Sequence, residues 1–176
     1  NPWWTVMPDV SLYLQRLSFM LRQGRPVNDV ALYLPNDDAW ARFVPGRVGT
    51  MIEALSQRVG PTVVGRILDA GFGLDFFDAG VLAGIGRVEG DTVALGSNRY
   101  RVVVLPNVER IGDSTLRQLE AFVRSGGVLV ATARLPALAP GFLATAADHA
   151  KVVAAVDRLF RGPAAPAVFV EDDSRL

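Results

Sequence analysis

The first regular feature of the chain is a stripe of hydrophobic residues at helical spacing. It begins after Asp9, whose carboxylate is placed to accept from the first free amides of a helix. It stops before Gly24, a residue type that commonly ends helices in the left-handed conformation. The stripe predicts one amphipathic helix; its members are Val10, Tyr13, Leu14, Leu17, Met20 and Leu21. We expect residues 1–24 to form a linker and a helix that pack on the domain that follows.

Beyond this helix, short apolar runs alternate with helical patterns. Runs that are apolar throughout are typical of parallel strands buried on both faces; they cover residues 29–35, 72–77, 101–106, 128–131 and 167–170. Helical spacing predicts helices between these strands; they cover residues 49–70, 78–83, 113–126 and 148–160. We expect the first of them to be interrupted at Pro61, and we expect Asp113 to cap the third. We predict a polar loop at residues 36–38 and a small hairpin, outside the core, at residues 87–95.

This order of elements predicts a three-layer α/β/α domain over residues 25–176. Strands that alternate with helices form a parallel sheet covered on both faces, and right-handed crossovers give five strands a flavodoxin-like order. A length of 176 residues fits a single domain. We interpret the start at Asn1 and the acidic tail at residues 171–173 as cut points, so that the chain is a fragment of a larger protein.

Composition narrows the classes of function. The 18 basic and 18 acidic residues give a net charge of zero, so the basic excess expected of a nucleic-acid binder is missing. The sequence has no cysteine, which excludes disulfides, thiolate metal sites and a cysteine nucleophile. No apolar run reaches the roughly 18 residues that a membrane span needs, so we expect no membrane partner. The composition does not determine the cellular compartment, and it is compatible with a secreted or periplasmic parent protein.

Polar residues that follow the predicted strands are the main candidates for a ligand site. Open α/β sheets bind ligands at the carboxyl ends of their strands, near the point where the strand order reverses. Asn36 and Asp37 follow the first strand, and Asn107 follows the third. Their oxygens suit sugar hydroxyls or Ca²⁺. Acidic residues at this place repel phosphate, so a flavin or nucleotide is not expected.

Four carboxylates near these strand ends could supply a catalytic pair. Asp37, Asp38, Asp75 and Asp78 could converge at the edge of the sheet, and glycoside hydrolysis requires paired carboxylates. Asp37, Asp38 and Asp78 are also natural loop and helix-cap residues. We favour the loop and cap interpretation, and we expect no catalytic residue in this chain.

The remaining candidates also have structural explanations. His149, the single histidine, falls at helical spacing with core valines, and no histidine or carboxylate group has metal-ligand spacing. The run 84–90 has Glu89 where the third glycine of a dinucleotide-binding motif belongs. Trp3 and Trp4 could stack on sugar rings or anchor the domain on a neighbour, and anchoring is the commoner use of large aromatics. We expect no metal and no cofactor.

Several sequence segments together carry a resemblance to a known family; they are Asn1-Pro-Trp-Trp, Tyr13-Leu-Gln-Arg, Leu21-Arg-Gln-Gly, Val27-Asn-Asp-Val, Gly73-Leu-Asp-Phe-Phe, Tyr100-Arg-Val-Val-Val-Leu-Pro and Phe122-Val-Arg-Ser-Gly-Gly-Val-Leu-Val. They resemble the region after the catalytic barrel in glycoside hydrolase family 106, the α-L-rhamnosidases. The chain is also similar to the non-catalytic domain of family 42 β-galactosidases. Both domains resemble the fold of class I glutamine amidotransferases without its chemistry.

The resemblance implies a non-catalytic structural or interaction module beside the barrel of a rhamnose-cleaving enzyme. The acid and base of that enzyme would lie outside this chain. The implied partners are the remainder of the parent chain and carbohydrate, and the oligomeric state stays open. Two alternatives remain: a sugar- or Ca²⁺-binding module that uses the crevice near Asn36, Asp37 and Asn107, and a free-standing amidotransferase-like enzyme that lacks cysteine.

Overall fold

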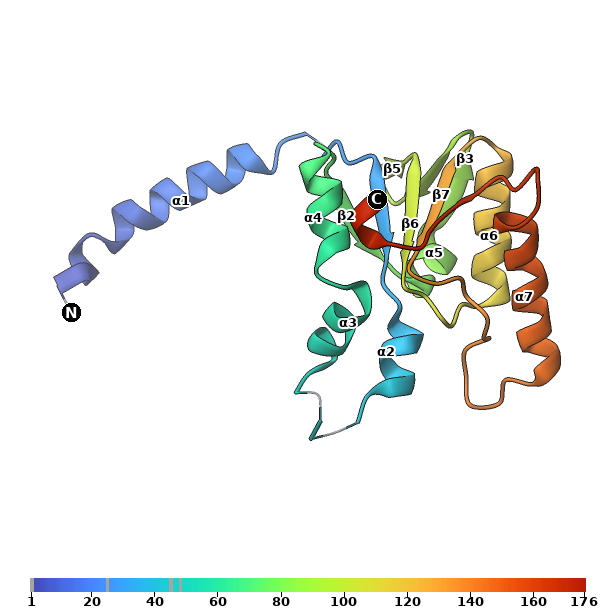
Figure 1. The fold of residues 1–176 in the computed structure, drawn as a ribbon. Helices are drawn as coiled ribbons and strands as arrows, with labels where there is room; N and C mark the ends of the chain where they lie inside the picture. Colours follow the sequence, from blue (N-terminus) through green and yellow to red (C-terminus); the bar gives the residue numbers. More distant parts are fainter. Residues whose placement is uncertain (1, 25, 45, 48) are drawn as a thin grey trace.

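The protein consists of a layered α/β body from which one helix projects (Figure 1). The computed structural model describes residues 2–24, 26–44, 46–47 and 49–176. Asn1, which begins the first segment of the family resemblance, and residue 25, where the expected domain begins, lie outside the described residues.

A five-stranded parallel sheet forms the centre of the body, in the order β2-β1-β6-β7-β8. Its strands are β1 (Val30–Tyr33), β2 (Leu74–Phe77), β6 (Val102–Pro106), β7 (Val128–Thr132) and β8 (Val168–Val170). Val30 in β1 is in register with Leu74 on one side and Val102 on the other. The five predicted strands and the flavodoxin-like order are therefore confirmed, with the order reversing between β1 and β6.

Helices cover both faces of this sheet, which confirms the three layers. One face packs against α3 (Met51–Val59) and α4 (Thr62–Asp69), two helices separated at Pro61 as predicted. The other face packs against α5 (Ala79–Ile85), α6 (Asp113–Arg124) and α7 (Ala146–Phe160). The short helix α2 (Asn36–Arg42) follows β1, and a 3-10 turn, η2 (Asp173–Arg175), ends the chain.

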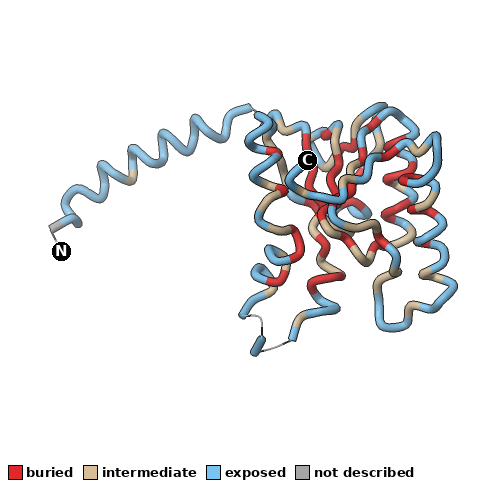
Figure 2. The backbone as a smooth tube through the Cα atoms, viewed as in Figure 1, coloured by how far each residue is buried: buried red, intermediate tan, exposed pale blue. Residues whose placement is uncertain are grey.

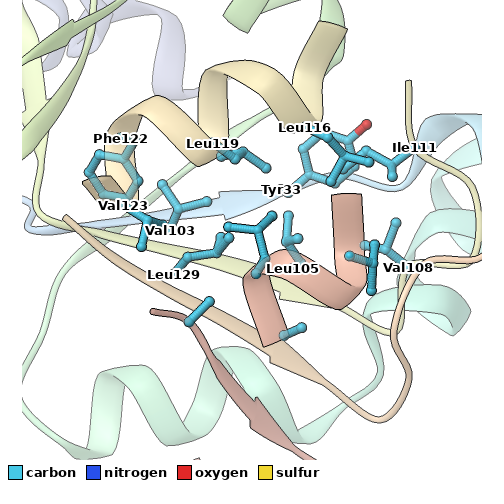
Figure 3. Packing of buried hydrophobic residues seen from close by; sticks show 14 of the residues in the cluster. Tyr33, Val103, Leu105, Val108, Ile111, Leu116, Leu119, Phe122, Val123 and Leu129 are labelled. Carbon is cyan, nitrogen blue, oxygen red and sulfur yellow. The ribbon is translucent and has the colours of Figure 1, made fainter. Parts of the chain in front are cut away.

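Each central strand supplies side chains to two cores because successive residues point to opposite faces. Leu32 packs on the α3 and α4 side, while its neighbour Tyr33 packs on the α6 and α7 side. Buried residues follow the strands and the inner sides of the helices (Figure 2). In the larger core, Leu105 and Leu129 from the sheet lie close to side chains of α6 (Figure 3).

A small antiparallel sheet corrects the prediction of a hairpin outside the core. Its strands are β3 (Gly86–Glu89), β4 (Thr92–Leu95) and β5 (Asn98–Tyr100), in the order β3-β4-β5. The hairpin is present, but a third strand joins it, and Val93 and Tyr100 are buried in the larger core. The phenol of Tyr100 donates a hydrogen bond to Asp75 over 2.8 Å. This sheet is therefore part of the packed body.

The N-terminal helix differs from the prediction in two ways. A 3-10 turn, η1 (Pro2–Thr5), leads into α1 (Met7–Leu21), so Asp9 lies in the first turn of the helix instead of capping it. Proline is favoured at helix starts, and Pro8 explains the earlier beginning. The helix buries none of its residues and projects away from the body (Figure 1). The packing of residues 1–24 on the domain stays a prediction.

None of the helices in the described part of the chain is long and apolar enough to cross a bilayer.

Candidate functional site

The carboxyl ends of β1 and β6 meet where the strand order reverses, and they bring most of the predicted polar residues together. The chain leaves β1 through a tight turn, in which the amide of Asn36 donates to the carbonyl of Leu34 over 2.8 Å. Asn36, Asp37 and Asp38 then form the first turn of α2, so the prediction of a loop was wrong. A seven-residue helix is too short to show a clear hydrophobic period, which is why the sequence did not reveal it.

Asp38 is fully buried and holds two strand ends together. Its carboxylate accepts from the backbone amides of Glu109, at 2.7 Å, and Arg110, at 3.0 Å. The guanidinium groups of Arg110 and Arg58 also donate to it, each over 3.2 Å. A buried carboxylate with four donors is satisfied and fixes the segment after β6 to α2. Asp38 is a structural residue.

Asn107 is tied into the same structure through Arg58. Its side-chain amide donates to the carbonyl of Arg58 over 3.1 Å, and its own carbonyl accepts from the Arg58 guanidinium over 2.9 Å. Its backbone is left-handed, with φ of 47°, a conformation that asparagine tolerates better than most residues. These two hydrogen bonds make Asn107 a link between α3 and the end of β6, and its ligand role stays a prediction.

Asn36 and Asp78 form a second structural pair. The amide of Asn36 donates to Oδ2 of Asp78 over 2.8 Å, while Oδ1 of Asp78 accepts from the amide of Val81 over 2.8 Å. Asp78 therefore caps α5, as predicted from its loop position. Each oxygen of Asp78 accepts one hydrogen bond, and one of them comes from the Asn36 amide, which links α2 to the start of α5.

Asp37 is the carboxylate at this edge that keeps its oxygens unoccupied. It is half-buried, and within the described part of the chain its carboxylate takes part in no hydrogen bond or ion pair. Burial raises its pKa above the ordinary value, and the charges of Asp38 and Asp78 raise it further, partly offset by Arg110. Asp37 thus carries free acceptor capacity at the point where the fold places ligands.

Glu109 gathers a group of arginines beside this edge. Arg42 donates to its Oε2 over 2.8 Å and Arg110 over 2.9 Å, while Arg134 lies 3.5 Å from Oε1. Burial works to raise the pKa of Glu109, but hydrogen bonds and charges from Arg42 and Arg110 outweigh it and hold the pKa below its usual range. Glu109 therefore holds three guanidinium groups together beside the switch point.

Three other predicted candidates lie elsewhere. Asp75 accepts from Asn28 over 2.9 Å and from Tyr100, on the face of β2 that packs toward the small sheet, and does not join the other carboxylates. Trp3 and Trp4 are 70% and 78% exposed near the far end of α1, well away from the switch point (Figure 1). The two tryptophans do not share a site with Asn36, Asp37 and Asn107.

His149 fixes a loop, as a structural histidine does. Its Nδ1 accepts from the backbone amide of Ala139 over 3.0 Å, which ties the start of α7 to the segment that follows β7. Among the described residues, no group of three or more His, Asp or Glu side chains is arranged to hold a metal ion. The run 84–90 ends α5 and enters β3, so its glycines do not precede a helix as a dinucleotide motif requires.

Trp40, an aromatic residue one helical turn beyond Asp37, was not among the residues predicted from the sequence. Its ring is 64% exposed, although it lies on the body of the domain and not on the projecting helix. Phe43 packs against it edge-to-face, with ring centroids 6.3 Å apart and an interplanar angle of 74°. The spacing between Asp37 and Trp40 was the signal available, but it has meaning only once α2 is known to be a helix.

The chain forms a doubly wound α/β domain. Most polar side chains at its switch point make hydrogen bonds or ion pairs that connect neighbouring elements of the fold. Hydrolysis of a glycosidic bond uses an acid and a second carboxylate that acts as base or nucleophile. Here Asp38 accepts from four donors and Asp78 from two, and among the described carboxylates at this edge Asp37 is the one without a hydrogen bond. The class that the fold defines is a doubly wound α/β module with three carboxylates, Asp37, Asp38 and Asp78, near its switch point.

Residues 1–168 match the family model described as α-L-rhamnosidase, glycoside hydrolase family 106. The chain therefore belongs to this family. No curated protein and no solved structure matches it.

Proposed function

We propose that this chain is a non-catalytic module of a family 106 glycoside hydrolase, and that it packs beside the catalytic barrel of the parent protein. The observation that carries the proposal is the bare apolar surface of α1. Val10, Leu14 and Leu17 lie on one side of this helix and are each 39% exposed or more. Apolar surface of this extent marks an interaction site. The catalytic part of the parent protein is its proposed partner.

The tryptophan pair supports the same role. Trp3 and Trp4 precede α1 directly and extend its apolar surface toward the N-terminus. Tryptophan is enriched among residues that anchor interfaces because it combines a large apolar area with one hydrogen-bond donor. We therefore assign Trp3, Trp4 and α1 to one anchoring segment, residues 2–21.

The state of the carboxylates supports a non-catalytic role. A catalytic acid must exchange its proton with substrate, and a nucleophile must reach the anomeric carbon. Asp38 is fully buried beneath four donors, and Asp78 caps a helix. We infer that the acid and base of the parent enzyme come from its barrel. The module then corresponds to an amidotransferase-like domain that is retained for its shape.

Activity of the purified chain gives the direct test. We expect no release of nitrophenol from 4-nitrophenyl α-L-rhamnoside above the rate without protein. Turnover that co-purifies with the chain and disappears in Asp37→Asn would overturn the non-catalytic role.

The proposed docking of α1 on the catalytic part is tested in the parent protein with two variants, each of which places charge on a different side of the helix. Leu14→Glu together with Leu17→Glu puts two charges into the apolar stripe, and we expect this variant to lower the melting temperature and the rhamnosidase activity. Gln15→Glu changes a polar position of the same helix away from the stripe and serves as the control. Equal behaviour of the two variants would contradict the assignment of α1 to an interface.

A further inference from the structure

We propose that Arg42, Arg110 and Arg134 form a binding site for the carboxylate group of a small-molecule ligand. The site goes beyond the packing role, because it assigns a ligand to the module itself. Its basis is the convergence of three guanidinium groups on a single carboxylate, that of Glu109. The distances to the oxygens of Glu109 are 2.8 Å from Arg42, 2.9 Å from Arg110 and 3.5 Å from Arg134.

The ion pairs at this edge of the sheet leave an excess of positive charge. Four arginines and two carboxylates belong to one connected network; its members are Arg42, Arg58, Arg110, Arg134, Asp38 and Glu109. Four positive charges against two negative charges leave a surplus of two positive charges in this network. Positive charges gathered in one place repel each other, and a further anion relieves that repulsion.

Hydrogen-bond donors also outnumber acceptors in the cluster. A guanidinium carries several N–H donors in a fixed fork that matches the two oxygens of a carboxylate. The Nε–H of Arg134 is buried and has no acceptor among the described residues. A buried donor without an acceptor is unfavourable. The cluster therefore lacks an acceptor, and the carboxylate of Glu109 shows which shape of acceptor fits between these groups.

The backbone holds Arg134 at this edge in spite of a local cost. The preceding residue, Ala133, has a φ of 61°, in the left-handed region that alanine rarely adopts. The amide of Ala133 donates to the carbonyl of Val170 over 3.0 Å, which fixes the bend to the neighbouring strand. Strained backbone persists where the surrounding structure fixes it, and such positions cluster at ligand sites.

Two of the three arginines are open to solvent. The side chain of Arg42 is 54% exposed and that of Arg134 is 41% exposed. Arg42 ends α2, which follows β1, and Arg134 follows β7, so the two flank the point where the strand order reverses. Doubly wound folds bind ligands at this point. The negative charge of Asp37 interacts with Arg110, so the positive surplus is largest at Arg42 and Arg134.

Glu109 is the internal competitor of such a ligand. Burial acts to raise its pKa, but hydrogen bonds and charges from Arg42 and Arg110 hold the pKa below its ordinary value, so Glu109 is charged at neutral pH. Glu109→Gln removes this charge and leaves all three guanidinium groups in the chain. A ligand carboxylate should therefore bind more tightly to Glu109→Gln, an effect that a purely structural cluster would not show.

Titration of the purified chain with malonate, at an ionic strength held constant with sodium chloride, tests the site. The NMR signals of the arginine side chains report binding, and we expect saturable shifts of those of Arg42 and Arg134. Binding should weaken about tenfold in Arg42→Gln and in Arg134→Gln, as expected for the loss of one charged hydrogen-bond donor. Arg117→Gln is the matched control, because it removes the same charge from an exposed ion pair with Asp113 and should leave binding unchanged.

Three results would overturn the site: no saturable shift with malonate, equal weakening in Arg117→Gln and Arg134→Gln, or weaker binding in Glu109→Gln. Inorganic phosphate is the second probe, and tighter binding of phosphate than of malonate would contradict the assignment of a carboxylate ligand. None of these outcomes bears on the nitrophenol assay or on the α1 variants, so the site and the proposed function can fail separately.

Discussion

Asp37 and Asp38 are neighbours in sequence, yet they have opposite roles at the residue scale. Asp38 is fully buried and accepts four hydrogen bonds, while Asp37 is half-buried and accepts none from the described residues. Their chemistry is the same, so the difference comes entirely from the rotation of α2. The sequence indicated that both lie at a strand end, but it could not say which one is buried.

Removal of Asp38 should destabilise the domain strongly. Asp38→Ala leaves the guanidinium of Arg58, itself buried, and two backbone amides without their acceptor. Breaking a buried ion pair in this way costs about 3–5 kcal/mol of unfolding free energy. Urea unfolding followed by circular dichroism measures it. Asp113→Ala, which removes an exposed partner of Arg117, is the control and should change the unfolding free energy little; similar losses in both variants would contradict the role of Asp38.

Substitution of Asp37 should stabilise the domain, and the gain in stability should depend on pH. Its pKa is raised in the folded chain, so the folded state binds the proton more tightly than the unfolded state does. Stability is then lost as the pH rises from the unfolded to the folded pKa, and the loss persists above it. We expect Asp37→Asn to raise the melting temperature at about pH 7 and to leave it unchanged below about pH 3, where both states are protonated. A lower melting temperature at neutral pH would refute this.

At the scale of elements, the turn between α6 and β7 shows how closely the helix and strand layers approach. Gly126 adopts a φ of 99° and ends the helix, as its place in the sequence predicted. Gly127 has a different role, because a Cβ atom there would overlap the ring of Phe122 in the core. The Gly-Gly pair therefore serves one backbone requirement and one packing requirement.

A methyl group at Gly127 should disrupt this turn. We expect Gly127→Ala to lower the unfolding free energy by about 1–3 kcal/mol, the range for overpacking a filled core. Gly65→Ala is the matched control, because Gly65 lies exposed within α4 with open space around it. That substitution should raise the unfolding free energy by about 0.5–1 kcal/mol through better helix propensity. A shift of the unfolding free energy in the same direction in both variants would contradict the close approach of Gly127 to the ring of Phe122.

At the scale of the whole molecule, we expect the folding stability of the body to be independent of the anchoring segment. The two cores draw their residues from the body beyond residue 29, while α1 contributes none. A chain that begins at residue 25 should therefore keep its melting temperature within about 2 °C, since it loses no core contact. It should also self-associate less than the full chain in sedimentation experiments, because the bare apolar stripe is gone. Loss of cooperative unfolding on truncation would show that α1 does contribute to the core.

The strands, the main helices and the layered fold could be predicted from the sequence by a local physical rule. A strand buried on both faces must be apolar throughout, and Val30–Tyr33 and Val102–Pro106 show this in the sequence itself. The break at Pro61 and the cap at Asp78 are equally local, since they depend on one ring and one side-chain oxygen.

Only the tertiary structure decided how distant residues use their hydrogen bonds. The sequence proposed Asn36, Asp37 and Asn107 as one polar site, but Asn107 binds Arg58 and Asn36 binds Asp78 across separations of 49 and 42 residues. Such pairings depend on strand order and helix rotation, which no local pattern encodes. For the same reason, the position of Trp3 and Trp4 at the far end of α1 became known only with the tertiary structure.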